Sequence, residues 1–127
     1  MRPSMRPLCF AAALVISSSS FAGEVSRALF TIGIDNREPV IMVDSIDSSS
    51  YTSISFFTEL SDLSGHNVTH QWTHNDKVMF EKTFEVKDAR WRVWTSKTLA
   101  PSWTGTWTVN VLDDDRAVLT SKSFEYQ

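Results

Sequence analysis

The chain has 127 residues, of which 42% are hydrophobic, and this is enough for one domain with one core. Its 12 basic and 15 acidic side chains give a formal net charge of −3. Without Arg2 and Arg6, residues 23–127 carry 10 − 15 = −5, and this acidic excess gives no electrostatic reason to bind nucleic acid or anionic lipid.

Residues 1–22 have the pattern of a secretory signal peptide. Arg2 and Arg6 precede an apolar run at 8–16, and the small residues Ser20 and Ala22 suit cleavage after Ala22. The run is far shorter than the ~20 residues of a spanning helix, so we expect no membrane span in the mature chain. We therefore expect an exported domain, residues 23–127, that is periplasmic or secreted.

The chain's only cysteine, Cys9, lies inside this expected signal peptide. It precedes most of the apolar run, whereas a lipid-modified cysteine would follow the run, so lipoprotein anchoring is disfavoured. Because residues 23–127 contain no cysteine, no disulfide can stabilise the domain, even in an oxidising compartment. The fold must depend on packing alone.

Apolar and polar residues alternate with period two through residues 23–127, without a helical stripe. Pro39 marks the run after it as an edge strand, and the serine-rich stretch 44–50 is expected to be a loop. Asn75 and Asp76 are typical of a two-residue hairpin turn. The expected strands are 28–34, 40–43, 52–60, 68–74, 77–86, 90–97, 105–112 and 117–126.

Two of these runs have irregular phases. Val78, Phe80 and Phe84 share one face of their run, and only Lys82 interrupts that face. In the last run Leu119 is out of phase with its neighbours, which predicts a β-bulge without giving its place. Roughly eight short strands with turns between them predict an all-β fold, an antiparallel sandwich.

Two aromatic positions make the prediction more specific. Trp72 lies in mid-strand after the strand that contains Phe56, where immunoglobulin domains place a core tryptophan. Gly105, Trp107 and Val109 follow the spacing of the immunoglobulin corner motif, with Trp107 in place of the corner tyrosine and Val109 in place of the cysteine. We expect an immunoglobulin-like antiparallel β-sandwich of about 7–8 strands without a disulfide.

Several short motifs resemble the bacterial family catalogued as domain of unknown function 2914. The resemblance extends from about Arg27 to Tyr126, and the motifs are fairly specific in combination. It implies an exported domain, found alone or attached to membrane segments, and it brings no assigned activity. The motifs are REPV (37–40), FFTEL (56–60), VTHQW (68–72), RWRVWTSKTL (90–99) and PSWTGTWTV (101–109).

The tryptophan-rich stretch 90–107 is the main candidate for a binding surface. Strand alternation places Trp91 and Val93 on the inner face, and Arg92 and Trp94 on the outer face, close enough for a guanidinium to lie over the indole. Trp72, Trp91 and Trp107 are expected in the core, while Trp103 either closes the core or faces outward. The candidate ligand-binding residues are Arg90, Arg92, Trp94, Lys97 and Trp103.

The histidines and the acidic clusters give weaker indications of a site. His66, His70 and His74 recur every fourth residue, and in a strand they stand ~13 Å apart, too far to share one metal. A single histidine with ligands from another strand remains an alternative, although a buried hydrogen-bonded His70 is favoured. Residues 113–115 carry oxygens that Ca²⁺ would accept, but they match no calcium loop and are expected to form a solvated turn.

No catalytic motif is present. The chain has no nucleophile elbow, no His-Glu-x-x-His and no phosphate-binding glycine loop, and a Glu59–Asp62 acid–base pair would lack a cleft. We therefore expect a non-enzymatic exported interaction domain without cofactor or metal, binding a protein partner in the cell envelope. The alternative is a carbohydrate-binding module that stacks envelope glycan on Trp94 and Trp103.

Overall fold

The computed structural model describes residues 23–127, so the predicted signal peptide lies outside the described residues. These residues form strands and turns only, and none of them belongs to a helix that could cross a membrane. The strands are β1 (Glu24–Thr31), β2 (Ile34–Asp35), β3 (Glu38–Pro39), β4 (Met42–Val43), β5 (Ser45–Ile46), β6 (Ser53–Ser61), β7 (Asn67–His74), β8 (Lys77–Glu85), β9 (Arg90–Thr98), β10 (Gly105–Leu112) and β11 (Val118–Tyr126).

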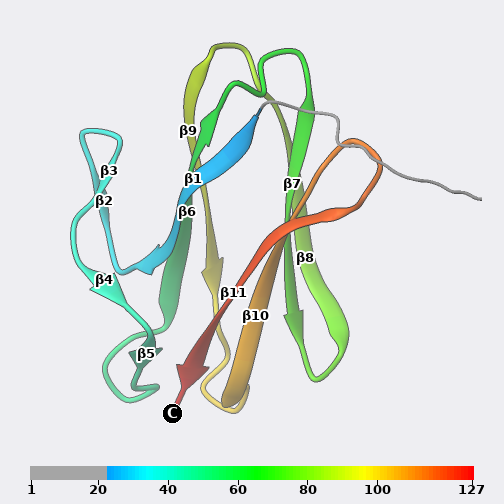
Figure 1. Cartoon of the computed structure of the whole chain (residues 1–127). Coiled ribbons are helices and arrows are strands. Elements are labelled where there is room, and N and C mark those ends of the chain that lie inside the picture. The colour runs from blue at the N-terminus through cyan, green and yellow to red at the C-terminus, as the bar shows by residue number, and fades with distance from the viewer. Residues whose placement is uncertain (1–22) are drawn as a thin grey trace, which may run out of the picture.

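Two sheets pack face to face, as Figure 1 shows. The four-stranded sheet has the order β4-β1-β6-β9, and the five-stranded sheet has the order β5-β11-β10-β7-β8. The β2–β3 hairpin stands outside the sandwich, beside β1 and β6 (Figure 1). All pairings are antiparallel except that of β5 with β11, which is parallel. The predicted all-β sandwich is confirmed.

The two aromatic residues predicted for an immunoglobulin-like core lie there. Trp72 on β7 is fully buried, with its ring edge-on to Phe30 and Phe124. Trp107 on β10 is also fully buried, and its indole N–H donates to the carbonyl oxygen of Trp103 at 2.9 Å. This bond has the role of the tyrosine corner, in which the aromatic residue entering the sixth main strand bonds back to the chain upstream.

A closed set of hydrogen bonds crosses the core beside Trp72. His70 has no exposed surface, and its Nε2 and Nδ1 lie 2.9 Å and 3.0 Å from the hydroxyls of Thr58 and Thr95. The Trp72 N–H donates to the Thr95 oxygen at 2.9 Å. Thr95 can then donate its proton to Nδ1, while Nε2–H donates to Thr58, whose hydroxyl faces the Val93 carbonyl. This tautomer is the one in which every proton has an acceptor.

Three predicted details of the strands are wrong. The first strand ends at Thr31 rather than at residue 34, because the chain leaves to form the β2–β3 hairpin. A bulge between Val78 and Phe80 turns Val78 outward, 49% exposed, and lets Met79 pack on the core. The expected loop 44–50 contains β5. The bulge predicted in the last strand lies at Leu119.

On the edge strands β8 and β9, lysines occupy positions whose side chains alternate toward the core, which we call inward-phase positions. Lys82 on β8 lies opposite buried His70, and Lys97 on β9 lies opposite buried Ile54. An inward-phase lysine on an edge strand hinders pairing with a foreign strand. The interruption at Lys82 is therefore explained by the position of β8 at the edge of its sheet.

Acid is expected to destabilise the fold through His70. Burial lowers the pKa of His70 from 6.5 to about 3, so as the pH falls below 6.5 the unfolded chain takes up a proton that the folded chain does not. The free energy of unfolding should therefore decrease between pH 6.5 and pH 5, by about 2 kcal/mol from this group. Urea unfolding across this range measures the loss. The same loss should persist in His66→Gln, and a flat profile in the wild type would contradict the assignment.

Candidate functional site

The outer face of the four-stranded sheet carries a network of arginines and glutamates. Phe57 on β6 faces outward yet is fully buried, because the Arg27 guanidinium lies 4.9 Å from its ring centre. Arg27 binds Glu38 of the hairpin through two hydrogen bonds, at 3.0 and 2.9 Å, and its Nε donates to Glu59 at 2.9 Å. A bidentate arginine–carboxylate pair fixes orientation as well as distance. Glu38 thereby ties the β2–β3 hairpin to the sheet.

Two of the predicted ligand-binding arginines belong to this network. Arg92 binds Glu38, and Arg90 binds Glu59 with its Nε 3.0 Å from the carboxylate. Arg27 and Arg92 lower the pKa of Glu38 to about 2, and Arg90 and Arg27 lower the pKa of Glu59. Both carboxylates are therefore ionised at neutral pH. Arg92 therefore holds the hairpin against the sheet, whereas Arg90 binds a carboxylate within the sheet.

Trp94 lies outward on β9, and the guanidinium over its ring belongs to Arg37, at 5.6 Å from the ring centre. The sequence had suggested Arg92 for this place. Asn36 and Arg37 form the hairpin turn with φ of 52° and 62°, and this left-handed turn directs Arg37 back to β9. Its Nη2 also donates to the Arg92 carbonyl at 3.0 Å, which satisfies one oxygen of the β9 edge.

A pocket of about 300 Å³ opens beside Trp94, where the edge strands β8 and β9 face each other. Its polar groups are Arg37, Arg92 and Glu85, and its apolar walls include both Trp91 and Trp94. Trp91, predicted in the core, is half-buried and packs against the core from this side.

The other two candidate residues lie apart from Trp94. Lys97 faces the opposite sheet, with its Nζ 5.8 Å from the ring centre of Phe80 and 5.5 Å from that of Trp103. Trp103 is half-buried and packs on Trp107. It therefore closes the end of the core instead of facing outward, the two positions that the sequence had left open. The five candidates thus form two groups, Arg90, Arg92 and Trp94 on the outer face, and Lys97 with Trp103 at the end of the core.

Each histidine has its own hydrogen-bond partner. The His66 Nδ1 lies 2.7 Å from the Asp114 carboxylate, and His70 is enclosed in the core. The His74 Nε2 lies 3.0 Å from the Thr104 carbonyl, and its ring is stacked on Trp107 at 4.5 Å. Within residues 23–127 no three histidine, cysteine or acidic side chains are placed to hold a metal ion.

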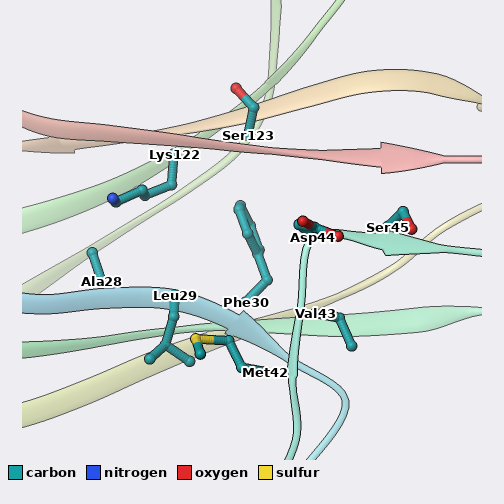
Figure 2. Close-up of a pocket in the computed structure, with 9 residues that line it drawn as sticks. All are labelled: Ala28, Leu29, Phe30, Met42, Val43, Asp44, Ser45, Lys122 and Ser123. Carbon is teal, nitrogen blue, oxygen red and sulfur yellow. The ribbon is translucent and has the colours of Figure 1, made fainter.

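A groove lies between β1 and β11, with a volume of about 520 Å³. Figure 2 shows the Phe30 ring standing between the two strands, and Lys122 reaching from β11 toward Ala28. Beside the groove, Val40, Ile41 and Met42 are 57%, 52% and 71% exposed. Exposed apolar residues that are contiguous mark interaction sites more often than isolated ones.

The groove could not be predicted from the alternation of residues in the sequence. The apolar run after Pro39 was its one visible signal, and we interpreted that run as an ordinary edge strand. The groove exists because β4 pairs with β1 while β5, directly after it, pairs with β11, so the chain crosses between the sheets at Asp44. Such a crossing depends on long-range pairing, which alternation does not show.

Comparisons with known proteins support the fold and a family resemblance. Residues 65–126 match the family described as "Protein of unknown function (DUF2914)", which confirms the resemblance inferred from the motifs. The chain is also similar to the crystal structure of an immunoglobulin-like protein from Pseudomonas aeruginosa, with 12% identity and a TM-score of 0.58. The similarity covers 87% of this chain and 100% of that one, and it shows the fold alone. No curated protein sequence matches this chain.

Arg37 provides a test of the contact over Trp94. Arg37→Ala and Arg37→Gly both remove the guanidinium, and both should shift the tryptophan emission to longer wavelength as Trp94 becomes exposed. Only the glycine relieves the left-handed φ, which costs an L-residue about 1 kcal/mol. Urea unfolding should therefore find Arg37→Gly more stable than Arg37→Ala by about that amount. If the two variants are equally stable, the left-handed φ at this turn has no energetic cost. If the emission is unchanged in both, the Arg37 guanidinium does not shield Trp94.

Proposed function

We propose that this chain is a non-enzymatic interaction domain, exported to the periplasm or the cell exterior, that binds a protein partner in the groove between β1 and β11. The observation that carries the proposal is the groove itself, about 520 Å³ beside the exposed Val40, Ile41 and Met42. Its volume lies within the range of about 300–1,000 Å³ that is usual for binding sites. An exposed apolar border of this kind is stabilised when a partner covers it.

Two further observations support the proposal. Two of the three histidines have structural hydrogen bonds, since both ring nitrogens of His70 bond to buried threonine hydroxyls and His74 bonds to a carbonyl. Export is supported by the sequence pattern of residues 1–22, with its basic start, apolar run and small residues before the domain.

Site-specific photo-crosslinking tests the groove as the binding place. Benzoylphenylalanine at the positions of Met42 and Lys122, both at the groove, should give an adduct of one defined mass in cells that naturally make the protein. The matched control positions are Val78, exposed on the far edge strand β8, and Lys87, in the β8–β9 turn. Adducts that form equally at the control positions, or none at the groove, would count against the proposal.

A carbohydrate-binding module is the second candidate, and the pocket beside Trp94 favours it. Two indoles and two guanidiniums line that pocket, and exposed indoles can stack on the aliphatic faces of sugar rings while guanidiniums bond hydroxyls. The structure limits this candidate to Trp94, because Trp103 lies in a separate group and Arg37 covers one face of the Trp94 ring.

Tryptophan fluorescence titrated with peptidoglycan fragments and common polysaccharides tests this second candidate. A glycan in the pocket should give a saturable change that Trp94→Ala abolishes and Trp103→Ala retains, because Trp94 lines the pocket and Trp103 does not. Absence of any saturable change in the wild type would remove the candidate.

A further inference from the structure

The edge of β11 that faces the groove lacks a strand partner along most of its length. At its end, Glu125 donates its backbone N–H to Asp44 at 3.0 Å, and Ser45 and Ile46 of β5 pair with Glu125 and Tyr126. Backbone groups alternate sides along a strand, so the N–H and C=O of Ser121 and Ser123 point the same way as those of Glu125. Within residues 23–127 these groups have no backbone partner, because the chain before β5 pairs with β1 instead.

We propose that an extended segment of a partner protein adds to this edge as a further strand, in line with β5. This inference rests on the proposed function and specifies how the partner is held. An unpaired strand edge presents backbone donors and acceptors with the same spacing as those of another extended chain. Addition of a strand satisfies these groups, while pockets for the side chains determine which segment binds. The groove alongside Ser123 provides the space for this added strand. Two residues further along β11, at Glu125, the short strand β5 already pairs with the same edge.

Lys122 determines which segment fits. Its side chain has the same phase as the buried Val109 opposite it, so it points inward, and Figure 2 shows it along the groove toward Ala28. The partner residue beside Lys122 must point to the same side, where an acidic side chain would pair with the ammonium. Residues two positions away share that face and meet Phe30, so they should be apolar. Asp44, at the end of the groove beside Ser45, disfavours a second acid there.

A second copy of the chain does not meet this requirement. When two β11 edges pair antiparallel through the backbone groups of Ser121 and Ser123, residues of even number lie opposite residues of even number. Lys122 then meets Thr120, Phe124 or another Lys122, and never Glu125. Like charges opposite one another destabilise such a pair. The occupant is therefore a different protein that supplies the acidic residue.

Proline substitution on the free edge tests strand addition directly. The probe is a phage-displayed library of random peptides of about a dozen residues, selected on the purified wild-type protein. Ser121→Pro and Ser123→Pro each remove an N–H that faces the groove, whereas the bonds to β10 use the alternate residues, so the sheet tolerates them. Ser121→Ala and Ser123→Ala are the matched controls, since they lose the same hydroxyl and keep the N–H.

The selected peptides should carry an acidic residue at a common position with apolar residues two positions away. Their Kd should rise at least about tenfold in the proline variants and stay within about twofold in the alanine variants. Lys122→Glu should reverse the preference, so that selection on it enriches lysine or arginine at that position.

The other outcomes separate the two proposals. If binding is lost in Met42→Arg but is unaffected by either proline, the groove binds a partner without strand addition, and only this inference is wrong. If neither change matters, or if no peptide is selected, both proposals are wrong. A dimer of the purified wild type that Ser123→Pro dissociates in sedimentation would identify the occupant as a second copy and overturn the choice of partner.

Discussion

Trp72 joins the two sheets of a sandwich whose described residues contain no cysteine. Its ring is buried between Phe30 of one sheet and Phe124 of the other, and its N–H donates across the core to Thr95. Thr95 continues through His70 to Thr58, so polar groups of both sheets are satisfied together. An unpaired polar group in such a core costs about 1–3 kcal/mol, so this arrangement favours one relative placement of the sheets. The hairpin and the groove depend on that placement.

The edges of the two sheets differ in how well they are protected. On one side, β8 and β9 carry inward-phase lysines, and Arg37 occupies a carbonyl of the β9 edge. On the other side, β4 and β5 each cover only two residues of their neighbours, and the groove remains between β1 and β11. The cause is the excursion of the chain after Thr31, which Glu38 holds in place by binding Arg27 and Arg92. The network that fixes the hairpin thus also determines where the sandwich is open.

The candidate residues show where reasoning from alternation succeeds and where it fails. Alternation correctly placed Trp94 outward and Trp107 in the core, because the face of a residue follows from its position in one strand. It could not find Arg37 as the partner of Trp94, because Arg37 lies in a turn far from Trp94 in the sequence and reaches it only through the hairpin. The same limit applies to Val78. The extra residue of the bulge, Met79, turns Val78 from the inner to the outer face of β8, and the alternation in residues 77–86 gives no sign of this bulge.

The class of fold, the main strands and the core positions of Trp72 and Trp107 all followed from the sequence, as did the immunoglobulin-like corner at Trp107. These features depend on local periodicity, turn residues and apolar volume, all of which can be read from neighbouring positions. The pairing of Arg90 and Arg92 with glutamates, the separation of Trp103 from Trp94 and the groove beside Lys122 became visible in the folded structure alone. Those features arise from pairing between strands far apart in the chain, and the bulges and short edge strands that set such pairing leave little trace in composition or periodicity.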